Sequence, residues 1–185
     1  MFHVHNAFRA PGRTAEAEFG KPKVDVFRAR YEALRKGINA KAIYIDEDSA
    51  AELDGVTFAF VCVDKGKSKA GIFEVLLAKG TPFIYVWMVL KRRSGGLNGM
   101  ARVTYYPTDL GQEISRMGLA ELQNQPDDLY RTNIQISELN AMNAALAVIR
   151  YKQLRGFYHD GAAYYHLLLE VADLKIVGVN KHDED

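Results

Sequence analysis

The sequence predicts an α/β fold with a doubly wound, mixed β-sheet, which is parallel in its core and has additional antiparallel strands. Two short, nearly continuous apolar runs, residues 56–63 and 83–90, are typical of buried parallel strands. Between them, residues 68–79 have helical character and end before Gly80, so the three segments form a strand–helix–strand unit. A chain of 185 residues with 48% hydrophobic residues is enough for one domain spanning residues 1–185.

The first third of the chain contains short elements separated by breakers. Residues 1–6 are interpreted as the end of a strand, and the Pro-Gly pair that follows at 11–12 ends regular structure. Apolar residues recur at helical spacing over residues 24–36, with a glycine at the position of a helix C-cap. Residues 42–45 predict a short strand, and residues 50–53 predict a short helix.

The second apolar strand is expected to turn back on itself. A basic, glycine-containing hairpin over residues 91–99 connects it to an antiparallel return strand, residues 100–106. Residues 109–132 are polar and weakly periodic, so we interpret them as a loop or crossover region with little helix.

The C-terminal third begins with the strongest helical pattern of the chain. A helix over residues 136–154 is predicted from an apolar stripe at steps of three and four, which consists of Leu139, Met142, Leu146 and Ile149. Residues 164–171 and 174–179 then predict a final hairpin.

Composition narrows the class of protein. The formal net charge of +1 argues against a nucleic-acid-binding protein, which usually has a basic excess. No apolar run approaches 18 residues, so no membrane span is expected. The single cysteine, Cys62, excludes an intramolecular disulfide and a cysteine-rich zinc site, and it favours a reducing, cytoplasmic setting.

Candidate site residues follow two of the expected strands. In an open parallel sheet, ligands bind beyond the carboxyl ends of the strands. Asn6 and Arg9 follow the first expected strand, and Asp64 follows residues 56–63, with lysines at positions 65, 67 and 69. A carboxylate there suits magnesium and the nearby cations suit phosphate. A helix cap or turn former is an equally good interpretation of Asp64.

Other polar residues have a structural interpretation. Cys62 lies within the apolar strand and is interpreted as a buried packing residue rather than a nucleophile. Asn140 and Asn143, one turn apart, are interpreted as capping or bridging residues of the long helix. The chain has no Gly-x-Gly-x-x-Gly, and Gly66-Lys67-Ser68 lacks the glycine of a phosphate loop because position 61 is valine.

Five segments in the same order resemble the ThiF/MoeB/ubiquitin-activating-enzyme superfamily, and in particular a bacterial ThiF-family adenylyltransferase. The similarity covers nearly the whole chain and is carried by residues 5–12 (HNAFRAPG), 20–24 (GKPKV), 60–64 (FVCVD), 80–84 (GTPFI) with 99–104 (GMARVT), and 133–141 (NIQISELNA).

The resemblance implies a Rossmann-like domain that binds ATP and magnesium. It also implies adenylation of the C-terminal carboxylate of a ubiquitin-like or sulfur-carrier protein, and a homodimer. By motif, Asn6 and Arg9 would contact the ATP phosphates, Lys23 rather than Lys21 would neutralise them, and Asp64 would bind magnesium. Attack of a carboxylate on a phosphate joins two anions, which requires clustered positive charge and a metal.

The sequence departs from the family pattern in several places. The glycine-rich strand–turn–helix unit with which family members begin is absent, so we expect an N-terminally truncated fold that starts at an internal methionine. Lys65 and Lys69 stand where many members have asparagine and arginine. The zinc-binding cysteine pairs and the thioester-forming cysteine are also absent. The alternatives are a catalytically inactive ThiF-fold module that binds a carrier or partner protein, and a dinucleotide-binding domain.

Overall fold

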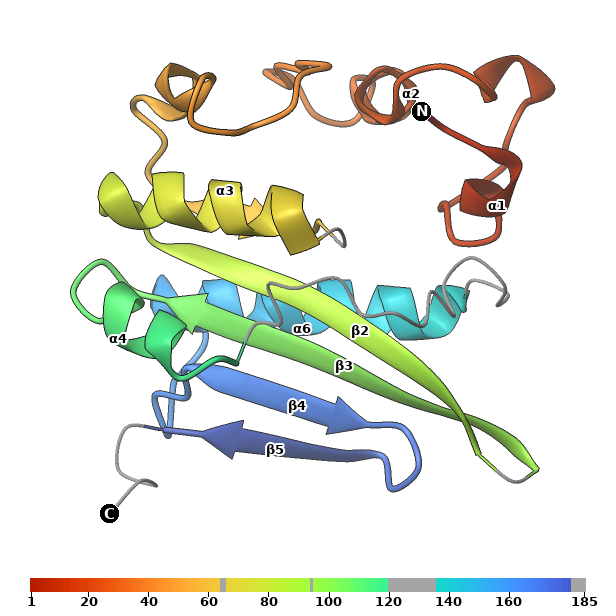
Figure 1. Cartoon of the computed structure of the whole chain (residues 1–185). Coiled ribbons are helices and arrows are strands. Elements are labelled where there is room, and N and C mark those ends of the chain that lie inside the picture. Colours follow the sequence, from red (N-terminus) through yellow and green to blue (C-terminus); the bar gives the residue numbers. More distant parts are fainter. Residues whose placement is uncertain (64–65, 94, 120–135, 181–185) are drawn as a thin grey trace.

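The computed structural model of the chain describes residues 1–63, 66–93, 95–119 and 136–180. It confirms an α/β fold built on one five-stranded mixed sheet with the strand order β1-β2-β3-β4-β5 (Figure 1). Among these strands β1 and β2 are parallel, and every other neighbouring pair is antiparallel. The strands are β1 (Ala59–Val61), β2 (Phe83–Arg93), β3 (Gly96–Tyr106), β4 (His166–Glu170) and β5 (Lys175–Val179).

Helices cover both faces of the sheet, because alternate residues of β2 and β3 are apolar on each face. On one face, α3 (Gly66–Ala78) and α4 (Gly111–Arg116) pack on an aromatic core. In this core, Phe73 contacts Phe83 with ring centroids 4.9 Å apart. On the other face, α6 (Ser137–Leu154) packs on an aliphatic core, which is formed by Met88, Leu90, Ala101, Leu139 and Leu169.

The expected elements of the central unit are confirmed. The helix predicted over 68–79 is α3, and Gly80 follows it with a φ of +62°, a conformation that favours glycine. The β2–β3 hairpin is tighter than predicted, because pairing continues to Arg93 opposite Gly96. The final hairpin is β4–β5.

Three expectations about strands are wrong or only partly right. Residues 42–45 form no strand, and Tyr44 is 86% exposed. The strand predicted over 56–63 is reduced to the three residues of β1. This strand lies at the edge of the sheet, and its middle residue, Phe60, is 45% exposed. The first residues are not a strand either: α1 (Val4–Ala7) forms there, and the backbone N–H of His3 donates to Asn6 Oδ1 at 2.8 Å.

The long helix α6 is present, but it is rotated relative to the apolar stripe that was expected to be buried. Met142 and Ile149 are exposed, because the face that packs on the sheet includes two polar side chains. The buried residues of α6 are Leu139, Asn143, Ala147 and Arg150. Arg150 forms an ion pair with Asp160 at 2.7 Å, which compensates for its burial.

The N-terminal segment has a small core of its own. Phe2 is completely buried between Phe19 and Phe27, with ring centroids 6.1 and 6.0 Å away. Arg30 lies over the Phe2 ring, and its guanidinium donates two hydrogen bonds to the Glu18 carboxylate at 2.9 and 2.7 Å. These contacts connect the short 3-10 helix Glu16–Glu18 to α2 (Lys23–Tyr31).

A second 3-10 helix, Ala50–Leu53, confirms the short helix predicted there and precedes β1. Residues 1–53 lie on the side of the molecule away from β5 (Figure 1). Within the part of the chain that the structure describes, no helix is long and apolar enough to cross a membrane.

Candidate functional site

A cavity of about 410 Å³ lies beside the carboxyl end of β1, between β2, α6 and the N-terminal segment. This volume is within the range of small-molecule sites. Three kinds of side chain line it: cations from the N-terminal segment, amides from α6, and apolar residues that include Phe60, Val86 and Val148. The position agrees with the rule that ligands bind beyond the carboxyl ends of parallel strands.

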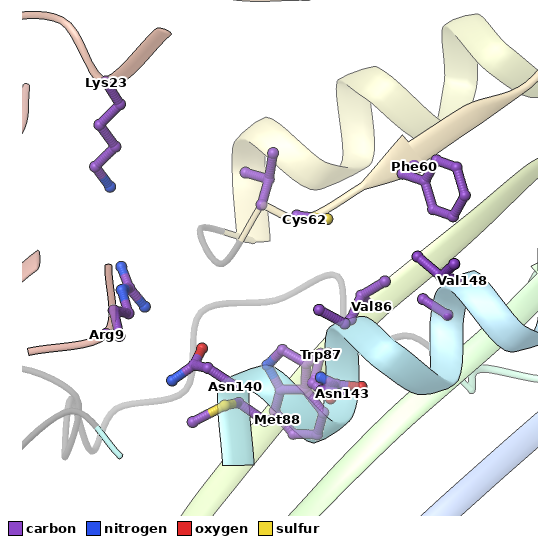
Figure 2. A pocket seen from close by; sticks show the side chains of 13 residues that line it. Arg9, Lys23, Phe60, Cys62, Val86, Trp87, Met88, Asn140, Asn143 and Val148 are labelled. Atoms are coloured by element: carbon purple, nitrogen blue, oxygen red, sulfur yellow. The ribbon is translucent and has the colours of Figure 1, made fainter. Parts of the chain in front are cut away.

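The structure brings two of the expected phosphate-binding residues into this cavity. Arg9 follows α1 and Lys23 begins α2, and both side chains line the cavity together with residues of β2 and α6. Figure 2 shows them approaching from one side, opposite Phe60 and Val148. The pKa of nearby His5 is lowered, first by burial and then by the positive charges of His3, Arg9 and Lys23. This end of the cavity is therefore electropositive.

The expected magnesium ligand, Asp64, lies outside the residues that the structure describes. Its neighbour Val63 lines the cavity, so the chain leaves β1 at the cavity wall. Among the residues that the structure describes, no Asp or Glu lines the cavity, and no group of three His, Cys, Asp or Glu could hold a metal ion. A magnesium ion at this place would thus depend on Asp64 and on ligand oxygens.

Asn6, the fourth expected site residue, does not line the cavity. The residue is 4% exposed. Its Oδ1 accepts a hydrogen bond from the backbone N–H of His3, and this bond stabilises the first turn of α1. Its backbone carbonyl accepts N–H groups of Arg9 and Ala10 at 3.3 and 3.0 Å. Asn6 thus shapes the turn that presents Arg9.

Of the lysines after β1, Lys69 has a described side chain, and it does not line the cavity. Lys69 is 2% exposed and lies on the α3 side of the sheet, where Nζ donates to the Tyr85 hydroxyl at 3.1 Å. Nζ is also 6.0 Å from the centre of the Trp87 ring, and Arg102 lies at 5.0 Å from that ring. The side chains of positions 65 and 67 are outside the described residues.

Cys62 was expected to be buried inside a strand, and the structure corrects this. It follows the last residue of β1, is exposed, and lines the cavity. Desolvation by the neighbouring protein nevertheless raises the pKa of its thiol, so at neutral pH the thiolate is disfavoured.

Two amides of α6 complete the cavity wall, and the sequence did not identify them as site residues. Asn140 Nδ2 donates to the carbonyl of Ile136 at 2.7 Å, and Asn143 Nδ2 donates to the carbonyl of Trp87 at 3.0 Å. Asn143 is one of the polar residues on the buried face of α6. The sequence signal was the pair of asparagines one turn apart in the first half of the helix.

Comparisons with known proteins give the fold but no family. No family model matches the chain, and no curated protein matches it. A crystal structure of selenomethionine-labelled PaaA is similar over 90% of this chain, with a TM-score of 0.54 and 13% sequence identity. The chain spans 57% of the length of that protein. At this identity the likeness supports the α/β fold alone.

Proposed function

We propose that the cavity binds the phosphates of ATP and that the chain is an ATP-dependent adenylyltransferase of the ThiF type. Its substrate would be the C-terminal carboxylate of a ubiquitin-like or sulfur-carrier protein, in a reducing, cytoplasmic setting. One observation carries the proposal. Arg9 and Lys23, far from β1 in sequence, line the same cavity as the end of β1, where an α/β sheet binds its ligand.

The proposed reaction gives the two cations a clear task. A carboxylate oxygen of the carrier attacks the α-phosphorus of ATP, a bond between oxygen and phosphorus forms, and the bond to the leaving pyrophosphate breaks. Both reactants are anionic, so charge must be neutralised as they approach. Arg9 presents a planar guanidinium that matches phosphate oxygens, and Lys23 adds a compact positive charge. Magnesium, held by Asp64, would neutralise further charge on the phosphates when bound.

The raised pKa of Cys62 bears on the product of this reaction. The thiol lines the cavity, but its thiolate is disfavoured, so the residue is poorly suited to take an acyl group from the adenylate. The single cysteine of the chain also lies outside the crossover region in which thioester-forming relatives have theirs, so the proposed chain releases an acyl-adenylate and forms no thioester on itself.

The alternative function is a catalytically inactive module that binds a carrier or partner protein. It is favoured by the absence of a glycine-rich loop, whose backbone N–H groups cradle nucleotide phosphates in related folds. A homodimer belongs to both proposals. It is supported by the edge strand β5, because Ile176 and Val177 are apolar and about half exposed.

ATP binding to the whole chain, measured by isothermal titration calorimetry with magnesium, tests the proposal. Arg9→Ala and Lys23→Ala should each weaken binding by roughly 10- to 100-fold, the value of a charge-assisted hydrogen bond. Arg35→Ala, which removes an exposed charge from the same segment outside the cavity, should leave the affinity unchanged. If the wild-type chain binds no ATP, or if Arg35→Ala has the same effect as Arg9→Ala, the proposal is wrong.

ATP–pyrophosphate exchange with a carrier that ends in two glycines separates the enzyme from the binding module. We expect weak exchange by this chain alone, because it lacks the phosphate loop. Carrier binding without any exchange would favour the inactive module. Rapid exchange would show that the loop is dispensable and would refute the expectation of weak activity.

A further inference from the structure

Phe60 presents an accessible aromatic ring to the cavity. Successive side chains of a strand point to opposite faces, and Val61 of β1 is buried in the aromatic core on the α3 side. Phe60 therefore lies on the α6 side, where it lines the cavity and is 45% exposed. Two neighbouring rings hold it in place, because the centroid of Phe58 is 5.3 Å away and that of Tyr151 is 5.4 Å away. The Phe60 ring is thus supported by aromatic neighbours, while nearly half of the residue remains accessible.

Apolar side chains of α6 lie across the cavity from Phe60. Val148 lines the cavity and is 47% exposed, and Ala144, one turn earlier on the same face, is exposed and lines it as well. Figure 2 shows the Phe60 ring on one side of this space and Val148 on the other. Since both residues are only about half covered, the described part of the chain does not fill the space between them.

This end of the cavity suits a planar apolar group. Removing apolar surface from water is favourable, and an aromatic ring gains further from contact with a second ring in an offset-stacked or edge-to-face arrangement. The lining cations, Arg9 and Lys23, lie at the opposite end (Figure 2), where an anionic group is favoured. The ligand that matches the cavity therefore has an anion at one end and a planar ring at the other.

A nucleoside triphosphate has this distribution of chemistry, because it joins a row of phosphates to a planar base. We propose that Phe60 binds the base of the nucleotide, with its ring against the base and Val148 on the far side. This inference rests on the proposed ATP-binding function and adds the residue that holds the base. A contact of this kind depends on the π-face that every base has, and not on the hydrogen-bonding groups of the base.

Binding of ATP and of inorganic triphosphate to the whole chain, each measured by isothermal titration calorimetry with magnesium, tests the inference. Inorganic triphosphate has the same row of phosphates and more negative charge, but no base. We expect ATP to bind about 5- to 100-fold more tightly, which is the contribution of one contact between an aromatic side chain and a base. Phe60→Ala should remove most of this difference by weakening ATP binding, and it should leave the affinity for triphosphate unchanged. Phe157→Ala is the matched control and should keep the difference, because Phe157 is 69% exposed and does not line the cavity.

Phe60→Trp keeps a ring at this position and reports on its contacts by fluorescence. Trp87 is the one native tryptophan, so the wild-type signal gives the background to be subtracted. The remaining fluorescence should be quenched more strongly by ATP than by inorganic triphosphate, and the affinity for ATP should be retained. If Phe60→Ala does not fold, as shown by circular dichroism, the result with Phe60→Trp decides.

Three results would overturn the inference while the proposed function stands. They are equal wild-type affinities for ATP and triphosphate, an equal loss of both affinities in folded Phe60→Ala, and equal quenching of Phe60→Trp by the two ligands. The second of these would indicate that Phe60 only supports the cavity wall. If the wild-type chain binds no ATP, the inference and the proposed function fail together.

Discussion

Acidification should destabilise the protein through a single buried histidine. His166 is 6% exposed, and its Nδ1 lies 2.8 Å from the Thr104 hydroxyl oxygen across the β3–β4 pair. Burial, with a further contribution from the positive charge of Arg102, lowers the pKa of His166 from 6.5 to about 4. The unfolded chain therefore takes up a proton on this histidine at a higher pH than the folded protein does.

The sign and size of the effect follow from this difference. Between about pH 6.5 and pH 4 the unfolded state binds more protons than the folded state, so the free energy of unfolding falls as the pH falls. At about 1.4 kcal/mol per pKa unit, the loss from His166 reaches about 3 kcal/mol at the acid end of this window. The loss per pH unit is steepest near the middle of the window.

Urea unfolding measured by circular dichroism at several pH values between 4 and 7 tests this expectation. His166→Asn is the informative variant, because asparagine can occupy the position of Nδ1 beside Thr104 but does not titrate. It should be less stable than the wild type at pH 7, and its stability should vary less with pH by about 3 kcal/mol over the window. Equal pH dependence in the two proteins would refute the assignment of the effect to His166.

Three further predictions concern packing. Phe73→Ala should lower the free energy of unfolding by about 3–5 kcal/mol, measured by chemical denaturation, because the ring is 2% exposed; a loss below about 1 kcal/mol would show that the aromatic core is not as described. Arg30→Ala removes the hydrogen bonds to Glu18, so it should weaken ATP binding and expose residues 1–31 to proteolysis. Arg28→Ala breaks only an exposed ion pair and should do neither. Equal digestion of the two variants would contradict this. Gly178→Ala should lower the free energy of unfolding by about 1–3 kcal/mol, since a Cβ there would lie 2.5 Å from the Tyr164 ring. Adding Tyr164→Ala should remove most of this loss, because it removes the ring. If the double variant keeps the full loss, the clash is not its cause.

The strand–helix–strand unit could be predicted because its signals are local. An apolar run, a helical segment and a glycine with positive φ each determine a short stretch of chain, and Gly55 and Gly80 have φ values of +74° and +62°. The prediction failed where a strand depends on its neighbours. Residues 42–45 have β-forming side chains but find no partner strand in the described part of the chain, and one face of β1 is open to the cavity, which Phe60 lines.

The candidate site could be predicted only in part, for a related reason. Arg9 was identified by its position after an expected strand and by resemblance, Lys23 by resemblance alone, and both line the cavity. Asn143 was assigned a structural role, because hydrophobic periodicity places Leu146 and Ile149 on the buried face of α6 and gives no weight to an asparagine. In the actual rotation of the helix, Asn143 donates a hydrogen bond to Trp87 and Arg150 forms an ion pair with Asp160. Partners of this kind are distant in sequence and leave no periodic signal.

The two ends of the cavity depend on different parts of the fold. The cationic end belongs to the N-terminal segment, whose internal order comes from buried Phe2 and from the bonds between Arg30 and Glu18. The opposite end belongs to β1 and α6, which contribute Phe60 and Val148. A ligand with an anion at one end and an apolar ring at the other would contact both parts at once. Loss of the cationic contacts should therefore weaken ligand binding by more than the energy of those contacts, because the ligand then no longer holds the two parts of the protein together.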